Sequence, residues 1–465
     1  MTKLFVLGGY LYQSLAAIGL VFAVSHLVDS AAYTAFSLVV ASSQLVAVLA
    51  FEWLQIAGTR FLAGAHEGEK LRLRSAVLSA FGLSAAALLV VAPVVFHFTA
   101  ARPLTAALAI GVAIAQSLAD LLLTILRVDN RLVPSAGLAI IRSTCLMGLA
   151  SLGAWLHPSA EAALAGMLFA QLCGIATVVA YDRRLVRWSW RDTHKADLQA
   201  YCHYGMKAAA ASVMHLGASV SVRFLVVGRL GHASTEAAGF SLAFDLLQRP
   251  FSVLAAAVHM VSFPEVAAKY DRSSLAEAQA ATARLFEFLL CSTALLMAGM
   301  ITFTSDIAWL FVPAAALSAF LAVAPAVTFL AFVNTHLQVT GAVVIHLLKR
   351  TQRLVLVAFG QLLVTVPSCW LVLANGGSVG TAIWVAGIAT FLWGVAMAAP
   401  TVRFAAFPDL RLIALCGAVA VAIFAMGWIG STPLLLFAAK LAAAGALTLF
   451  VLWRGRFLHS PRQAS

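Results

Sequence analysis

The stretch 86-AALLVVAPVVF-96 decides the fold class, because it holds no charged and no hydrogen-bonding side chain. A membrane β-strand would alternate apolar and polar residues, and this stretch does not. The apolar run around it covers about residues 75–98, and a helix of that length crosses roughly 30 Å of hydrocarbon. The stretch therefore predicts a membrane-spanning α-helix, which satisfies its own backbone hydrogen bonds in lipid.

The composition extends this prediction to the whole chain. Of the 465 residues, 62% are hydrophobic and 10% are charged, whereas soluble domains carry about 25% charged residues. The net charge of +12 does not indicate a nucleic-acid partner, because lysine and arginine stand at the ends of apolar blocks. The six cysteines form no CxxC pair, so we expect no disulfide framework, no metal site and no cofactor.

The apolar runs predict an all-α membrane protein with about 14 transmembrane helices. A short helix at the membrane interface is predicted around Trp309 to Phe320, where one apolar run is too long for a single span. The predicted spans are 4–27, 34–58, 75–98, 103–126, 135–156, 161–181, 205–228, 235–262, 285–305, 322–347, 353–373, 379–400, 411–429 and 433–453.

Lysine and arginine gather on one side of these spans. The loops on the other side hold only Arg102 and Arg229. Because cytoplasmic loops carry the positive excess, we predict both termini in the cytoplasm. The first span is read as retained and not as a cleaved signal peptide.

A repeat divides the chain. Ala35-Phe36-Ser37-Leu38 recurs as Gly239-Phe240-Ser241-Leu242, and each copy opens a span that ends in a charged loop. The hydropathy around the two copies also matches, which predicts two pseudo-symmetric six-helix lobes related by an axis along the membrane normal. The predicted domains are an N-terminal lobe (1–182), a basic cytoplasmic linker (183–204), a C-terminal lobe (205–400) and an extra transmembrane hairpin with a tail (401–465).

The basic segment 181-YDRRLVRWSWRDTHKADLQAYCHYGMK-207 joins the two lobes and interleaves Trp188 and Trp190 with arginines. This pattern is typical of a linker lying on anionic membrane lipids, with its aromatic rings at headgroup depth. A specific site for a lipid headgroup is the sharper alternative.

The arrangement of two six-span halves, a basic linker and an extra hairpin resembles the polysaccharide transporter branch of the multidrug/oligosaccharidyl-lipid/polysaccharide exporter superfamily. The segments 51-FEWLQIAGTRF-61, 225-LVVGRLGHASTEAAGFSLAFDLLQRPF-251 and 261-VSFPEV-266 resemble that branch locally. The resemblance implies a central cavity between the lobes and a flippase in the bacterial inner membrane. Its implied substrate is undecaprenyl-diphosphate-linked oligosaccharide, an O-antigen or exopolysaccharide repeat unit. Similar sequences often carry an acidic residue where this chain has Arg223, so no coupling-ion site is carried over.

Ionisable side chains inside the predicted spans are candidates for the transport site, because each costs about 2.5–3.5 kcal/mol at a helix centre and tends to face a cavity or a partner. Arg249 stands deep in its predicted span, directly before Pro250, which tends to kink a helix. Its planar, permanently charged fork suits a diphosphate. The alternative is an ion pair with Asp245, four residues earlier on the same face.

Other candidates carry the same ambiguity between function and packing. Arg223 and Arg142 are further candidate diphosphate contacts. The alternative for both is that the side chain reaches the lipid headgroups, and Arg142 has the further alternative of an ion pair with Asp120. Glu52, Asp120 and Asp245 are candidates for coupling or for ion pairs. The polar residues proposed for a sugar-contacting wall, or for helix packing, are Gln13, Ser14, Ser219 and Ser221.

One lysine and three histidines are predicted to be structural. Lys440 is expected to pack against the bundle, and His215, His336 and His346 to form interhelical hydrogen bonds. The chain has no G-x-x-x-x-G-K-[ST] loop and no H-E-x-x-H motif, so we do not predict an enzyme.

The rival functions are a multidrug/cation antiporter on the same architecture, a lipid II flippase, a non-transporting scaffold for polysaccharide assembly, and a glycosyl polymerase. Short outer loops disfavour the polymerase, and intramembrane arginines disfavour the scaffold. A glycan polymerase and a chain-length regulator are candidate partners of the flippase, which is expected to be a monomer.

Overall fold

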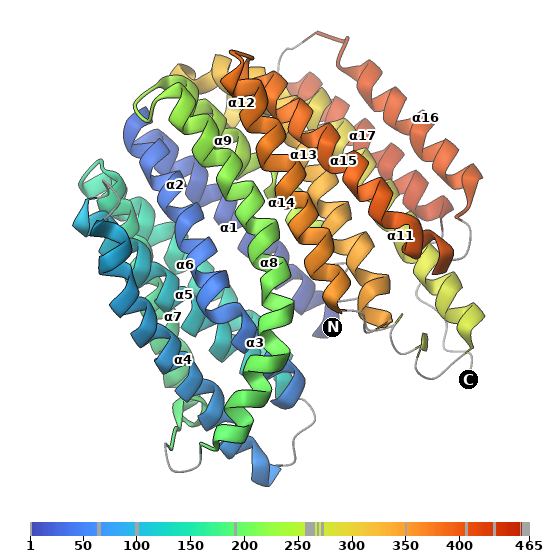
Figure 1. The fold of residues 1–465 in the computed structure, drawn as a ribbon. Coiled ribbons are helices and arrows are strands. Elements are labelled where there is room, and N and C mark those ends of the chain that lie inside the picture. Colours follow the sequence, from blue (N-terminus) through green and yellow to red (C-terminus); the bar gives the residue numbers. More distant parts are fainter. Residues whose placement is uncertain are drawn as a thin grey trace. The chain divides into compact units, whose positions relative to one another are not determined.

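The computed structural model describes residues 2–62, 67–97, 102–189, 193–255, 266, 269–270, 274–348, 351–404, 408–430, 434–455 and 457. Within these ranges all regular structure is helical, as the sequence predicts (Figure 1). The elements are α1 (Thr2–Leu27), α2 (Ser30–Ala47), the π-helical turn η1 (Val48–Glu52), α3 (Trp53–Leu62), α4 (Glu67–His97), α5 (Pro103–Val128), α6 (Leu132–Leu156), α7 (Ala160–Tyr181), the 3₁₀ turn η2 (Arg183–Val186), α8 (Lys195–Leu230), α9 (Thr235–Leu247), α11 (Leu275–Thr302), α12 (Thr304–Phe311), α13 (Ala314–Leu347), α14 (Thr351–Ala374), α15 (Val379–Phe404), α16 (Leu410–Met426) and α17 (Leu434–Arg454).

Short polar residues before the apolar runs set where several helices begin. Asp29 accepts a hydrogen bond from the backbone N–H of Ala32 and caps α2, and Ser159 caps α7 in the same way. Such caps satisfy backbone donors that the first helical turn leaves unpaired. Pro103 opens α5 at a position where its missing N–H costs nothing.

Among the described residues, eleven helices are long and apolar enough to cross a membrane. Leu11–Leu27 and Leu410–Met426 are shorter apolar helices. Each of the fourteen predicted spans coincides with one of these helices or, for the span 235–262, with α9, whose described continuation ends at residue 255. The exact number of membrane crossings stays a prediction.

The predicted interface helix is displaced. The sequence places it around Trp309 to Phe320, whereas α12 ends at Phe311 and α13 begins at Ala314. Val312 is extended and Pro313 follows it, and the residue before a proline is disfavoured in helix. This dipeptide ends α12 and lets residues 314–320 join the long helix α13.

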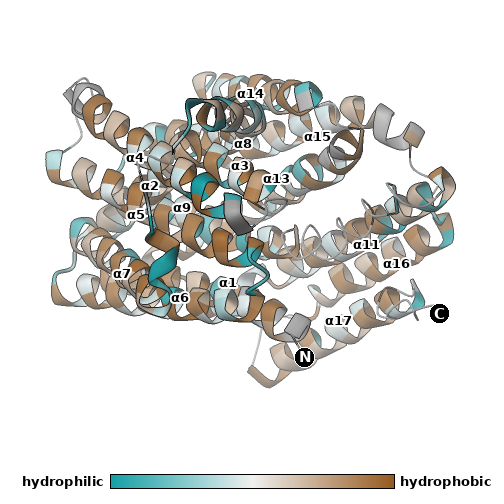
Figure 2. Ribbon diagram, turned by 90° about the horizontal axis from the view of Figure 1, so that it is seen from below, coloured by the Kyte–Doolittle hydropathy of each residue, from teal (hydrophilic) through white to brown (hydrophobic). Residues whose placement is uncertain are grey.

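The surface of the helices is apolar, as a membrane protein requires. Figure 2 shows brown turns along helices such as α6, α7 and α17, with teal residues in shorter stretches. Trp428 is 90% exposed and Leu435 is 85% exposed, values that suit contact with lipid and not with water. The chain is therefore a multi-pass membrane protein.

The chain divides into two compact units. Unit 1 comprises Met1–Ser241 and Leu354–Leu362, and unit 2 comprises Leu242–Arg353 and Leu363–Ser465. The lobe, linker and hairpin boundaries expected from the sequence stay predictions.

In unit 1, α4 to α7 run alongside one another (Figure 1), and α6 packs on α7 most extensively. Glycines allow this contact. A Cβ at Gly166 would lie 2.2 Å from the carbonyl oxygen of Leu149, and one at Gly153 would lie 2.3 Å from that of Ala162. Small residues at such crossings let helix backbones approach closely in a membrane.

In unit 2, α13 packs on α15, and α11 packs on α13 and α16. The hairpin of α16 and α17 is attached to α11 by the side chains of Leu412, Cys416 and Ile423 around the buried residues Cys291 and Leu295. Lys440 is 6% exposed, and its Nζ donates to the carbonyl oxygens of Ile429 and Gly430 at 2.6 and 3.3 Å. The lysine is thus held within its own hairpin, where it satisfies carbonyls beyond the end of α16. The predicted packing of Lys440 against the bundle stays a prediction.

Candidate functional site

Four polar side chains follow one line along the membrane span of α8. They are Ser212, His215, Ser219 and Arg223, separated by three and four residues, which is the spacing of neighbours on one helix face. Because α8 is continuous, this line covers about 16 Å of helix at 1.5 Å per residue. We call these four residues the α8 polar stripe. Three of them contact polar side chains from other elements of unit 1.

Ser212 meets Glu52 at the π-helical turn. Glu52 is the last residue of η1, which joins α2 to α3 inside one long apolar helix. The hydroxyl of Ser212 donates to the Glu52 carboxylate. π-turns insert one residue into a helix and often occur at functional positions. The partner of Glu52 is thus an uncharged serine of α8 and not the ion-pair partner that the sequence offered as an alternative.

A glycine brings α8 close to this acidic residue. A Cβ at Gly205 would lie 2.2 Å from the carbonyl oxygen of Trp53, the residue after Glu52. Backbone atoms cannot yield to such a clash as a flexible side chain can. Gly205 therefore fixes how closely α8 approaches α3 and so positions Ser212 against Glu52.

His215 lies one turn further along the stripe and is hydrogen-bonded to Gln361. Its Nδ1 faces Oε1 of Gln361, which is 1% exposed on α14, in the segment that belongs to unit 1. An amide oxygen only accepts, so this assignment makes Nδ1 the donor. The interhelical hydrogen bond predicted for His215 is confirmed.

Arg223 stands at the other end of the stripe. Its Nη1 donates to Oγ of Ser37 on α2 at 3.3 Å, and Ser37 is 2% exposed. Ser37 belongs to the repeated quartet Ala35–Leu38. Arg223 as a whole is half-buried.

Ser219 and Ser221, both predicted for a sugar-contacting wall, lie on different faces of α8. Ser219 belongs to the α8 polar stripe, whereas Ser221 follows two residues later on the same continuous helix. Two helical residues differ by about 200° around the axis, so the two side chains face opposite directions. We therefore keep Ser219 as a wall candidate together with the stripe and place Ser221 on another face.

Arg142 forms the ion pair that the sequence offered as its alternative role. Nη1 of Arg142 lies 2.6 Å from Oδ1 of Asp120, joining α6 to α5. The side chains are 15% and 30% exposed. Gly174 of α7 makes room for this arginine, since a Cβ there would lie 2.8 Å from its Cγ. The pair compensates both charges within unit 1.

The last two candidate charges belong to unit 2. α9 ends at Leu247, Gln248 interrupts the helix, and residues 249–255 are helical again. This interruption stands directly before Arg249 and Pro250, where the sequence predicts a kink. Asp245 and Arg249 are both half-buried. The side-chain Nε2 of Gln248 is buried and has no hydrogen-bond partner among the described residues.

Of the remaining candidates, Gln13 and Ser14 are half-buried on α1. Nε2 of Gln13 donates to the carbonyl oxygen of Gly9 in its own helix at 3.3 Å. In unit 2, His336 Nε2 lies 2.8 Å from the Thr293 hydroxyl of α11, which confirms its predicted interhelical hydrogen bond. The side chain of His346 lies outside the described residues. The described part of the chain holds no group of three His, Cys, Asp or Glu side chains that could bind a metal.

Ser212, Ser37 and Gln361 were not predicted from the sequence as partners of the candidate residues. The three- and four-residue spacing along 212–223 is a signal that could have revealed the α8 polar stripe. The partners of the stripe come from segments far apart in the chain, and no local pattern marks them.

Comparison with known proteins gives one family. Residues 73–312, half of the chain, match the model of a family described as "Polysaccharide biosynthesis protein". No curated protein matches.

Solved structures show the fold. An inward-closed lipid II flippase MurJ is similar with a TM-score of 0.74 at 13% identity, over 98% of this chain and 99% of that one. An inward-facing multidrug resistance MATE transporter of the MOP superfamily gives 0.64 at 16% identity, over 85% and 96%. A MOP superfamily transporter from Pyrococcus furiosus gives 0.58 at 16%, over 86% and 94%. The chain has the fold that these proteins share.

Proposed function

This chain belongs to the family of polysaccharide biosynthesis proteins, and on that premise we propose that it flips a lipid-linked oligosaccharide across the membrane. The proposed substrate is undecaprenyl-diphosphate-linked oligosaccharide, an O-antigen or exopolysaccharide repeat unit. The proposed direction is from the cytoplasmic to the outer leaflet of the inner membrane, by alternating access. The fold supports this proposal, because a protein named as a lipid II flippase shares it over nearly the whole chain.

Physical chemistry defines what such a protein must supply. A sugar chain and a diphosphate carry many polar groups, and each costs several kcal/mol (about 2–7) when it enters hydrocarbon without a hydrogen bond. The protein must therefore offer hydroxyls, amides and cations at membrane depth. The α8 polar stripe supplies such groups within a membrane span, and Ser219 and Arg223 are its members that we assign to substrate.

One observation carries the proposal furthest: an apolar span is interrupted at Gln248, directly before a half-buried arginine. An arginine at this depth is expensive unless it serves a partner or a wet surface. At the interruption the side-chain Nε2 of Gln248 has no hydrogen-bond partner in the described chain. We propose that Arg249 contacts the diphosphate, since its fork binds phosphate oxygens in pairs and stays charged.

The other candidates take graded roles in this proposal. Arg223 is a separate candidate for a diphosphate contact within unit 1, with Ser37 orienting it. Arg142 is a weaker candidate for the diphosphate, because Asp120 already compensates its charge. Glu52 and Asp245 are the proposed coupling residues. Gln13 and Ser14 complete the proposed sugar-contacting wall.

The test is flipping of lipid-linked oligosaccharide in proteoliposomes by purified protein carrying Arg249→Ala. Losing a hydrogen bond to a charged group costs about 1.5–3 kcal/mol, so we expect the rate to fall about ten- to a hundredfold. Arg249→Lys is the matched control, because it keeps the positive charge and loses only the two-pronged hydrogen bonding of the guanidinium. Its flipping rate should lie between those of the wild-type and Arg249→Ala proteins. Equal amounts of inserted protein exclude a folding defect. A wild-type rate in Arg249→Ala would remove this residue from the mechanism.

The same proteoliposomes separate the rival functions. Transport of a cationic drug, and none of oligosaccharide, would favour the multidrug antiporter. Flipping of lipid II alone would favour the cell-wall precursor, and no transport of any of the three would favour a scaffold.

A further inference from the structure

The connection between α7 and α8 is fastened to α4. We call residues 182–189 of this segment the α7–α8 connection. Nε1 of Trp188 donates to Oγ of Ser79 at 2.7 Å, and the backbone N–H of Ser189 donates to Oγ of Ser75 at 3.2 Å. Ser75 and Ser79 are themselves buried on α4. Two serines, one turn apart, thus hold the connection in a defined place.

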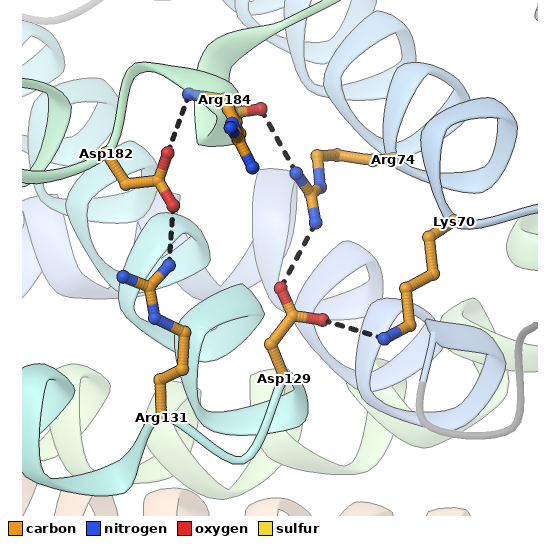
Figure 3. A network of polar contacts seen from close by, with 6 residues as sticks. All are labelled: Lys70, Arg74, Asp129, Arg131, Asp182 and Arg184. Atoms are coloured by element: carbon orange, nitrogen blue, oxygen red, sulfur yellow. Dashed lines mark hydrogen bonds and ion pairs between the residues drawn. The ribbon is translucent and has the colours of Figure 1, made fainter. Parts of the chain in front are cut away.

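Asp182 fixes the start of the same connection (Figure 3). Its carboxylate accepts hydrogen bonds from the Arg131 guanidinium and from the backbone N–H of Arg184. The hydrogen bond from Arg131 lowers the pKa of Asp182 below its ordinary value of 3.8, and the Arg184 N–H lowers it further. Because the pKa of Asp182 is lowered, its ionised carboxylate stabilises the folded connection at pH values above 3.8. This stabilisation is lost only as the pH falls through the lowered pKa.

A second carboxylate, that of Asp129, forms ion pairs with α4. Asp129 lies between Lys70 and Arg74 of α4, at 3.5 and 3.1 Å (Figure 3). Nη1 of Arg74 also donates to the carbonyl oxygen of Arg184 at 3.1 Å. Both acids are therefore occupied by cations and backbone groups of the network itself.

The outer side of the connection is basic and apolar together. Leu185 is 1% exposed and points inward, whereas Val186 and Trp188 are 38% and 55% exposed. Within the described chain, no carboxylate pairs with the exposed arginines of this segment. These are Arg183, Arg184 and Arg187.

α4 gives the depth of this surface in the membrane. Its first turns carry Lys70, Arg72 and Arg74, and from Ser75 onward the helix is uncharged to His97. The hydrocarbon boundary therefore falls near Ser75. The connection contacts Ser75 and Ser79, so its arginines stand at headgroup level and Trp188 about one turn deeper. Aromatic rings and arginines prefer this arrangement at an interface.

We infer that the α7–α8 connection is a preformed binding surface for anionic phospholipid headgroups of the leaflet at this end of unit 1. The three arginines match the phosphate charge, and the exposed Val186 and Trp188 match the adjoining acyl chains. The docking to Ser75, Ser79, Asp182 and Asp129 orders this surface before lipid arrives, which lowers the entropy lost on binding. This inference is independent of which substrate the protein moves.

The test measures binding of dioleoyl phosphatidylglycerol to the full-length protein in an uncharged detergent, by native mass spectrometry. The test variant is Arg183→Gln with Arg187→Gln, and the control is Arg102→Gln with Arg229→Gln. Both pairs are exposed arginines of unit 1 and change the net charge equally. We expect the affinity to fall about thirtyfold in the test variant, at about 1 kcal/mol per arginine near an anionic surface. The control should keep wild-type affinity.

Further arms separate a built surface from general attraction. Phosphatidylcholine should bind weakly to every protein, and inorganic phosphate should not displace phosphatidylglycerol if the acyl chains contribute. Ser79→Ala removes the anchor of Trp188 without changing charge and should weaken phosphatidylglycerol binding severalfold. Equal losses in the two arginine pairs, wild-type affinity in the test pair, or wild-type affinity in Ser79→Ala would each overturn the inference.

Discussion

At the scale of single residues, polar groups of unit 1 are satisfied across helices by uncharged partners as well as by charged ones. Glu52 is held by Ser212, and His215 is held by Gln361. By contrast, Arg142 is compensated by Asp120 at 2.6 Å. The Glu52 carboxylate thus has an uncharged partner, whereas the Asp120 carboxylate is compensated by a cation. On this difference we propose Glu52 and not Asp120 as a coupling residue.

Replacing Glu52 with Gln tests this assignment. The amide oxygen still accepts from Ser212, so we expect the stability to change by no more than about 1 kcal/mol. The side chain can no longer take up or release a proton. We expect an imposed pH gradient to accelerate the flipping of lipid-linked oligosaccharide by the wild-type protein in proteoliposomes. The Glu52→Gln protein should show no such acceleration, and its rate without a gradient should equal that of the wild type.

Ser212→Ala is the matched control for this experiment, because it removes the hydrogen bond and leaves the carboxyl group. It should retain a response to the gradient. Full acceleration in the Glu52→Gln protein would exclude Glu52 from coupling.

At the scale of elements, backbone contact between α6 and α7 depends on glycines that no apolar side chain can replace. Gly166 faces both a carbonyl oxygen and a Cα of α6, at 2.2 Å and 2.8 Å from the position of an added Cβ. Two backbones must separate to admit even one methyl group. Gly148, on α6 itself, has nothing within 4 Å of such a Cβ.

We therefore predict that Gly166→Ala destabilises the protein by about 1–3 kcal/mol, the usual cost of overpacking. Gly148→Ala should leave the stability unchanged or raise it slightly, because alanine favours helix. Thermal unfolding of the two variants in the same detergent compares them directly. Equal melting temperatures would contradict the close contact between α6 and α7.

Helix positions follow from the sequence because hydrophobic length and caps act locally, and the predicted runs coincide with the helices found. The Arg142–Asp120 pair was foreseen as an alternative, since both charges stand alone in apolar spans. The π-helical turn at Glu52 and the Gln361 contact were not foreseeable, because they depend on tertiary packing between distant segments. The shift of the interface helix was readable in principle from Val312 and Pro313, a local stop signal.

At the scale of the whole molecule, the open question is how many times the chain crosses the membrane. α16 is 17 residues long and α17 is 21 residues long, and both are apolar. Whether both helices cross or neither does, the predicted number of spans is even and the two ends share one side. If both cross, Trp428 at the turn lies on the side opposite to Arg411. If the hairpin lies on the surface, Trp428 at its turn stays on the same side as Arg411.

Single cysteines in a protein without its six native cysteines decide between these topologies. We predict that a membrane-impermeant maleimide labels Asn375→Cys and Trp428→Cys in intact spheroplasts, because these positions end outward-running spans. Arg183→Cys and Arg454→Cys should label only after permeabilisation, because arginine-rich ends stay in the cytoplasm. Labelling of Trp428→Cys only after permeabilisation would show that the hairpin does not cross. Labelling of Arg454→Cys in intact spheroplasts would instead show an odd number of spans. The orientation predicted from the lysine and arginine asymmetry would then be wrong.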